Sequence, residues 1–238
     1  MMNGLIALLG AGEYLPVVDP IDRYLLSSLH VEGRKARVVC LPTAAGQEGD
    51  ASVNRWSSMG VEHFQNLDAD VTALPIIDRA SADDPRYESA LESADLIYFS
   101  GGSPVYLYQT LQGSRAWNAA QKAWARGAAY AGCSAGAMIL AQTVPNFRLM
   151  GAASQPGFGV LPAAYVLPHF DRAPSVFKPM IFALRRSLKK GQFIIGVDEN
   201  TALVGRLGGD WQVMGVGEVH VISKNSEQTY SAGQQVPL

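Results

Sequence analysis

The sequence has 238 residues, 17% of them charged and 48% hydrophobic, and a formal net charge of −2. A chain of this length can bury a full core, removing roughly 70–75% of the unfolded chain's surface from water. Its 19 basic and 21 acidic residues are nearly balanced, and no Lys/Arg run is longer than that at 185–190, so the sequence lacks the basic excess typical of nucleic-acid binding. The two cysteines, Cys40 and Cys133, are too few for a disulfide framework, and no Cys-x-x-Cys motif occurs.

No apolar run reaches the roughly 18 residues that would cross a bilayer. The first residues, Met1 to Leu5, lack the basic region of a signal peptide. We therefore expect a soluble, cytoplasmic protein with neither a nucleic acid nor a membrane as a partner, and a homodimer is left open. No linker composition or internal repeat is present, so a single domain over residues 1–238 is predicted.

The first part of the chain alternates short apolar runs with longer amphipathic segments. Strands are expected at 5–9, 36–41, 70–74 and 95–99, and helices at 20–30, 52–65 and 87–91. Apolar strands separated by helices indicate a parallel sheet covered on both faces, because neither face then meets water. The predicted fold class is α/β: a three-layer αβα sandwich around a mostly parallel, doubly wound sheet.

Later segments extend this pattern and then change it. Residues 115–126 are amphipathic, and Gly127 suits the C-terminal cap of a helix there. Beyond about residue 190, the runs 193–197, 201–204 and 212–221 are separated only by Gly, Asp and Asn turns. This spacing predicts antiparallel strands that extend or flank the main sheet.

The first glycine-rich turn, Gly10-Ala11-Gly12, superficially suits a dinucleotide-binding loop. Leu15 stands where the third glycine should be, and the acid expected about 20 residues later is poorly placed. A close strand-to-loop turn is the better interpretation. The sequence also lacks a Walker-type Gly-Lys-Ser/Thr and any His/Cys/Asp cluster with metal-ligand spacing, so no metal or organic cofactor is expected.

The strongest motif is Gly132-Cys133-Ser134-Ala135-Gly136, between a run of small residues and a helical run at 137–141. Strand, nucleophile elbow and helix in this order lift a serine hydroxyl off the edge of a sheet. The amide of Ala135 then points to where an oxyanion would form. We predict Ser134 as a nucleophile, with a glycine-rich packing turn as the structural alternative.

Cys133 is intrinsically the better nucleophile, but it does not fit the centre of the elbow. Its flanking residues would be Ala131 and Ala135 instead of glycines. As the second residue of the elbow, it should point into the sheet. We therefore interpret Cys133 as a buried structural thiol.

An activated serine needs a base within hydrogen-bond reach. His169 follows the expected strand at 165–167, and ligand chemistry in open α/β sheets takes place at that edge. We predict His169 as the base. His30 and His63 lie in or at the end of helical segments, where a solvated or capping role is expected, and His220 alternates along a late strand.

These residues belong to a set of motifs that occur in a characteristic order: Gly101-Gly102, Gly132 to Ala137, Gly157 to Leu161, Pro168-His169-Phe170 and Gly196 to Leu203. Together they resemble the S51 serine peptidases, the group of dipeptidase E and cyanophycinase, which share a fold with the class I glutamine amidotransferases. The resemblance implies Ser134 as nucleophile, His169 as its base, and the amides of Gly102 and Ala135 as the oxyanion hole.

The sequence departs from that family pattern in two places. Typical members follow the double glycine with Asn or Asp and then Gln or Thr, which engage the substrate. Here Ser103-Pro104 follows instead, which leaves Ser103 as the substrate-binding candidate and Pro104 without a side-chain hydrogen bond. Family triads usually draw their acid from between the serine and the histidine, but residues 135–168 contain no Asp or Glu.

The orienting acid must therefore come from elsewhere. Asp171 lies two residues after His169, the spacing of the amidotransferase-type His-x-Glu, and Glu199 follows the strand at 193–197. The sequence ranks Asp171 and Glu199 equally and Asp198 behind them. Asp171 could instead cap a helix near Pro174, and Asp198 could begin a turn. A neutral group, Asn146 or Gln155, is a further alternative to an acid.

The roles of two arginines and of one acid in the first loop remain open from the sequence. Arg172 and Arg148 could bind an acidic substrate, or both could be solvated surface residues. Glu13 follows the first strand and could face the site or form a loop salt bridge.

We expect a serine-type peptidase that hydrolyses small peptides through an acyl-enzyme. The alternative is a catalytically weak or silent binding protein on the same scaffold, motivated by the missing intervening acid and by Ser103-Pro104. A third, weaker hypothesis is a thiol amidotransferase-like or chaperone-like protein that uses Cys133.

Overall fold

The computed structural model describes residues 4–145, 154–172 and 178–238. Its main sheet has eight strands in the order β14-β11-β10-β1-β5-β4-β2-β3. Five neighbouring strands are parallel: β1 (Ile6–Leu9), β5 (Ala129–Cys133), β4 (Leu96–Phe99), β2 (Arg37–Leu41) and β3 (Asp70–Ala73). Three antiparallel strands extend the sheet beyond β1: β10 (Thr201–Gly205), β11 (Trp211–Gly215) and β14 (Gln235–Val236).

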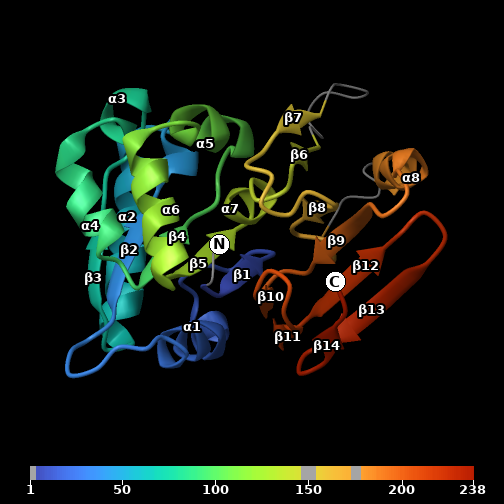
Figure 1. Cartoon of the computed structure of the whole chain (residues 1–238), viewed down its shortest axis with the longest axis horizontal. Helices are drawn as coiled ribbons and strands as arrows, with labels where there is room; N and C mark the ends of the chain where they lie inside the picture. The colour runs from blue at the N-terminus through green and yellow to red at the C-terminus, as the bar shows by residue number, and fades with distance from the viewer. Residues whose placement is uncertain (1–3, 146–153, 173–177) are drawn as a thin grey trace.

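A second, four-stranded sheet lies beside the main sheet (Figure 1). In order, its strands are β13 (Glu227–Ser231), β12 (Glu218–Ile222), β9 (Phe193–Val197) and β8 (Ala164–Leu167). Strand β9 pairs antiparallel with β12, but it pairs parallel with β8. The run expected at 212–221 is therefore two strands in different sheets. A small hairpin joins β6 (Thr143–Val144) and β7 (Gln155–Pro156).

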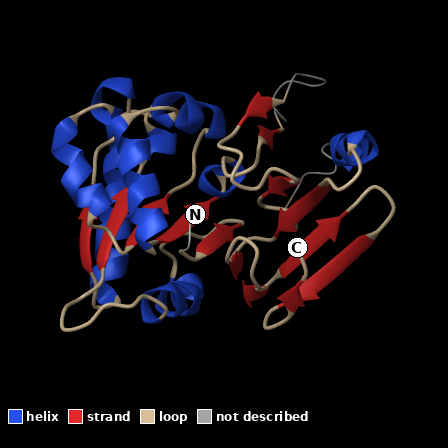
Figure 2. Ribbon diagram, viewed as in Figure 1, coloured by secondary structure: helices blue, strands red, loops and turns tan. Residues whose placement is uncertain are grey.

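Helices cover both faces of the parallel strands (Figure 2). The helices are α1 (Asp19–Ser27), α2 (Asp50–Asn66), α3 (Arg79–Ala82), α4 (Glu88–Glu92), α5 (Pro104–Leu111), α6 (Arg115–Arg126), α7 (Ala135–Met138) and α8 (Lys178–Ser187). Short 3-10 turns are η1 (Pro16–Val18), η2 (Thr43–Ala45) and η3 (Pro85–Tyr87). Helix α7 is shorter than the helical run expected at 137–141 and begins earlier. None of these helices combines the length and the apolar character of a membrane span.

Alternation along β1 shows how the two faces are filled. Ile6 and Leu8 belong to the core cluster that includes Trp117 of α6. Ala7 belongs to the opposite cluster, which includes Ile21 of α1. Since successive side chains of a strand point to opposite faces, each apolar strand is buried by helices on both sides. The predicted three-layer α/β fold is confirmed.

His63 differs from its predicted solvated or capping role. His63 belongs to α2 and its side chain is buried. Its Nε2 atom lies 2.8 Å from Oδ2 of Asp22 in α1. The ring also packs against Phe64 and Tyr14. His63 therefore links α2 to α1 through Asp22. The two residues are 41 positions apart, so the local sequence pattern did not predict this contact.

Candidate active site

Ser134 stands directly after the central strand β5, at the carboxyl end of the parallel sheet. Its backbone has φ 50° and ψ −106°, a conformation that costs on the order of 1–3 kcal/mol for a residue other than glycine. The amide of Ser134 donates to the Leu9 carbonyl, and its own carbonyl accepts from the amides of Ala137 and Met138. These bonds turn the chain abruptly from β5 into α7, and this turn is called the elbow below.

The two glycines of the motif allow this turn to close. A Cβ atom on Gly132 would lie 2.4 Å from the carbonyl carbon of Gly136. A Cβ atom on Gly136 would lie 2.7 Å from the carbonyl oxygen of Phe99 in the neighbouring strand. Both distances are far shorter than real Cβ contacts, so side chains at either position would force the elbow open.

His169 faces Ser134 from the second sheet. Its Nε2 atom lies 3.2 Å from Ser134 Oγ, and its Nδ1 atom lies 2.8 Å from Glu199 Oε1. His169 follows β8 and Glu199 follows β9, and these strands are parallel neighbours. The carboxyl ends of parallel neighbours meet at one edge, which explains how residues 30 positions apart come into contact. Ser134, His169 and Glu199 thus form a continuous hydrogen-bonded chain.

The acidic candidates have separate contacts. Glu199 touches the imidazole, whereas Asp171 Oδ1 accepts a hydrogen bond from the backbone amide of Glu199 at 2.9 Å. Asp198 Oδ2 accepts from the backbone amide of Glu218 at 2.9 Å. Among the neutral alternatives, Gln155 lies in the β6–β7 hairpin. Asn146 is outside the described residues.

The double glycine, Gly101-Gly102, passes directly against Ser134. A Cβ atom on Gly101 would lie 3.4 Å from Ser134 Cβ, and Gly102 has φ +140°, a conformation that favours glycine. The next amide, that of Ser103, donates to the Ala44 carbonyl at 2.8 Å. Neither the Gly102 amide nor the Ala135 amide donates a hydrogen bond to a described group. Ala135 follows Ser134 directly in the chain, and Gly102 follows the glycine that lies against Ser134.

Glu13 links the double glycine to the elbow through hydrogen bonds from Gly101 and Cys133. Its buried carboxylate accepts a hydrogen bond from the Gly101 amide at 2.8 Å through Oε1, and from the Cys133 thiol at 2.8 Å through Oε2. Glu13 makes no salt bridge to a described residue, unlike the loop alternative considered from the sequence. Its position after β1, the strand next to β5, was the one sequence signal for this contact.

The thiol of Cys133 is fully buried and lies beneath the elbow. Burial raises the pKa of the thiol well above its ordinary value, and the charge of Glu13 raises it further. Because a thiolate is the nucleophilic form, this environment suits a structural thiol.

Comparison with known proteins decides the family. The model of peptidase family S51 matches residues 6–209. The chain belongs to peptidase family S51. It is 36% identical to a peptidase from an acI-B1 Actinobacterium, whose crystal structure superimposes with a TM-score of 0.90 over 100% of this chain and 98% of that chain.

A more distant structural likeness supports the same fold. A putative peptidase E protein from Listeria monocytogenes EGD-e is 20% identical, with a TM-score of 0.64 over 97% of this chain and 100% of that chain. No curated protein matches the sequence.

The departure from the S51 pattern at Ser103-Pro104 has a structural basis. These residues begin α5: Ser103 Oγ accepts a hydrogen bond from the Tyr106 amide at 3.3 Å, and Pro104 occupies the first helical position. Proline is well tolerated there because its missing N–H would have no partner within the helix. The helix was not among the expected elements, because Gly-Gly-Ser-Pro has the composition of a loop.

The arginine candidates are placed unequally. Arg172 is exposed, and its Nε atom lies 3.8 Å from Glu199 Oε2 and 3.6 Å from Asp171 Oδ2. It therefore presents a cation beside the His169–Glu199 pair. Arg148 lies outside the described residues.

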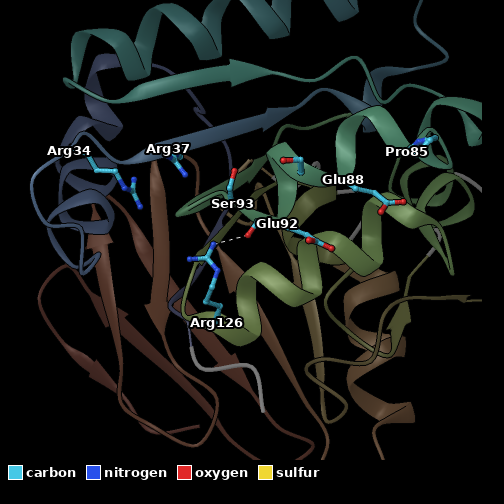
Figure 3. A pocket seen from close by; sticks show the side chains of 8 residues that line it. Arg34, Arg37, Pro85, Glu88, Glu92, Ser93 and Arg126 are labelled. Carbon is cyan, nitrogen blue, oxygen red and sulfur yellow. Dashed lines mark hydrogen bonds between the residues drawn. The ribbon is translucent and has the colours of Figure 1, made fainter.

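A depression of about 620 Å³ lies at the opposite end of the parallel sheet (Figure 3). Its lining includes Arg34 and Arg126, which have structural partners. Arg34 Nη1 lies 2.6 Å from Asp95 Oδ2, and Arg126 Nη2 donates to the Glu92 carbonyl at 2.8 Å. Because these residues precede or begin their strands, the depression is at the edge opposite Ser134.

Proposed function

We propose that this chain is a serine-type peptidase that hydrolyses small peptides through an acyl-enzyme on Ser134. The observation that carries the proposal is the chain of contacts from Ser134 Oγ to His169 Nε2 at 3.2 Å and from His169 Nδ1 to Glu199 Oε1 at 2.8 Å. Membership of peptidase family S51 supports the same reaction class. Both distances lie within the reach that general-base catalysis requires.

In the first half of the proposed reaction, Ser134 Oγ attacks the peptide carbonyl carbon as its proton moves to His169 Nε2. The Nδ1–H of the resulting imidazolium donates to the Glu199 carboxylate, which holds the ring and stabilises its charge. The amides of Gly102 and Ala135 donate to the developing oxyanion. Collapse of the tetrahedral intermediate breaks the C–N bond, and the amine leaves with the proton from His169.

In the second half, a water molecule attacks the acyl carbon of the ester. His169 Nε2 takes the water proton and then returns a proton to Ser134 Oγ as the C–O bond breaks. The product is a carboxylic acid, and the enzyme regains its starting protonation state. No group outside the chain other than water is needed for this cycle.

The silent-scaffold alternative rested on the missing acid between Ser134 and His169 and on the Ser103-Pro104 departure. Glu199 occupies the expected contact with the imidazole from a later part of the chain. This contact favours the peptidase. The buried, high-pKa thiol of Cys133 similarly disfavours the thiol-based hypothesis.

A peptide-library hydrolysis assay tests the proposal. The unsubstituted protein should release amino groups from small peptides, and Ser134→Ala should abolish release while the protein remains folded. Ser93→Ala, at the opposite edge of the sheet, is the matched control and should retain full activity. Hydrolysis by Ser134→Ala at the normal rate would refute the assignment, and a folded protein inactive on the whole library would favour the silent scaffold.

A further inference from the structure

Asp198 has a buried carboxylate oxygen that the triad does not use. The residue is 7% exposed and follows β9, immediately before Glu199. Its Oδ2 atom accepts a hydrogen bond from the Glu218 amide, but Oδ1 has no hydrogen-bond partner among the described residues. A buried oxygen without a partner costs about 1–3 kcal/mol, and more when charged, so it requires a physical explanation.

His220 lies opposite this oxygen, in the neighbouring strand β12. Its Nε2 atom is 3.5 Å from Asp198 Oδ1, and the pair does not meet the geometry of a hydrogen bond. The other ring nitrogen, Nδ1, lies 3.1 Å from Thr229 Oγ1. A protonated ring would form an ion pair with Asp198 at this distance. A neutral ring whose Nδ1–H donates to the Thr229 hydroxyl has a lone pair on Nε2, and two acceptor atoms then lie close together. A cation between them would satisfy both.

Glu218 provides a third donor group at the same place. Ligand atoms of Asp198, Glu218 and His220 all lie within 4.8 Å of one another. Glu218 is exposed and its Oε1 atom is 3.3 Å from Ser231 Oγ, so its side chain can rotate toward the other two without leaving a packed core. The residue before Glu218 is Gly217, and its lack of a side chain lets the backbone at 217 lie against Asp198. A Cβ atom on Gly217 would lie only 2.8 Å from Asp198 Cβ.

We propose that Asp198, Glu218 and His220 bind a divalent transition-metal cation of the Zn²⁺ type. One imidazole and two carboxylates are ligands that suit Zn²⁺, and bond lengths of about 2.0–2.2 Å place two tetrahedral ligands roughly 3.3–3.6 Å apart. The separation of 3.5 Å between Asp198 Oδ1 and His220 Nε2 fits that requirement. Thr229 supplies the second hydrogen bond that orients a metal-bound histidine.

The position of this cluster gives the cation a structural role next to the triad. Asp198 adjoins Glu199, and the His220 ring lies 4.7 Å from Phe170, which adjoins His169. A bound cation would link the residue after β9 to β12. It would thereby restrict the movement of Glu199, which adjoins Asp198, and of His169, which adjoins Phe170. It takes no part in the proposed peptide hydrolysis, and its binding can be measured without that reaction.

Calorimetric titration of Zn²⁺ into chelator-stripped, full-length protein tests the site. We expect one equivalent to bind, and His220→Gln and Asp198→Asn each to weaken binding at least tenfold. His30→Gln, at an exposed histidine, is the matched control and should bind as the unsubstituted protein does. His169→Ala should also retain binding, which separates the proposed site from cation binding at the triad. Circular dichroism identifies any variant that fails to fold.

In the Zn²⁺ titrations, any of three outcomes would overturn the site: no binding by the unsubstituted protein, unchanged binding by folded His220→Gln, or loss of binding in His169→Ala alone. If Asp198→Asn fails to fold, the test rests on His220→Gln. The His220 side chain is partly exposed, so its substitution should not prevent folding. Titration with Mg²⁺ provides the last distinction. Mg²⁺ binding as tight as that of Zn²⁺ and independent of His220 would indicate a simple acidic surface and contradict the proposal.

Discussion

The backbone amide of Glu199 donates to the carboxylate of Asp171, while the carboxylate of Glu199 contacts His169. The two acids that the sequence ranked equally therefore occupy successive positions in one network. Glu199 touches the imidazole, and Asp171 acts on Glu199 through the main chain. Asp171 is accordingly a positioning residue in the proposed mechanism.

This division predicts different effects for two conservative substitutions. Glu199→Gln removes the negative charge that stabilises the imidazolium, and kcat should fall by up to about 10⁴-fold. Asp171→Asn keeps an oxygen that accepts the Glu199 amide, so kcat should change by less than about tenfold. Steady-state kinetics on one peptide substrate measures both. A large loss in Asp171→Asn together with near-normal activity in Glu199→Gln would reverse the assignment.

Glu13 should be required for both stability and turnover. Glu13→Ala leaves the buried Gly101 amide without its acceptor, which should lower the free energy of unfolding by about 1–3 kcal/mol. The double-glycine loop should also shift beside Ser134 and reduce kcat. Glu13→Gln retains an oxygen acceptor and should recover part of both losses. Urea unfolding and kinetics of the two variants provide the test, and an unaltered Glu13→Ala protein would contradict it.

The cysteines should resist alkylation in the native protein. Burial raises the pKa of Cys40 to about 12 and that of Cys133 well above its ordinary value, so both remain protonated thiols near pH 8. Iodoacetamide should leave both thiols and the enzymatic activity intact, and it should modify both in denaturant. Mass spectrometry counts the adducts. Rapid modification of native Cys133 with loss of activity would instead revive the thiol-based hypothesis.

Asp95 should make stability depend on acid pH. Burial alone would raise the pKa of Asp95, but hydrogen bonds from Arg34 and the Arg37 amide outweigh burial and lower it below 3.8. A lowered pKa in the folded state stabilises the protein above the unfolded-state pKa, and this contribution disappears as pH falls through the folded-state value. The stability difference between the unsubstituted protein and Asp95→Asn should therefore shrink below about pH 4. A difference independent of pH would contradict this linkage.

Local patterns predicted much of the fold and part of the candidate site. The apolar runs and glycine elbow placed the parallel strands and Ser134, and the edge rule for α/β sheets selected His169. The pairing of β8 with β9 brings Glu199 to the imidazole, but the sequence could not predict that strand register. The contact of Glu13 with Gly101 likewise joins residues 88 positions apart and depends on the tertiary structure.

Labelling with a fluorophosphonate, followed by peptide mapping, tests the central claim most directly. The account predicts one adduct per chain, on Ser134, formed much more slowly in His169→Ala and absent from Ser134→Ala. An unlabelled, folded protein, or an adduct on another residue with Ser134 unmodified, would contradict activation of Ser134 by His169.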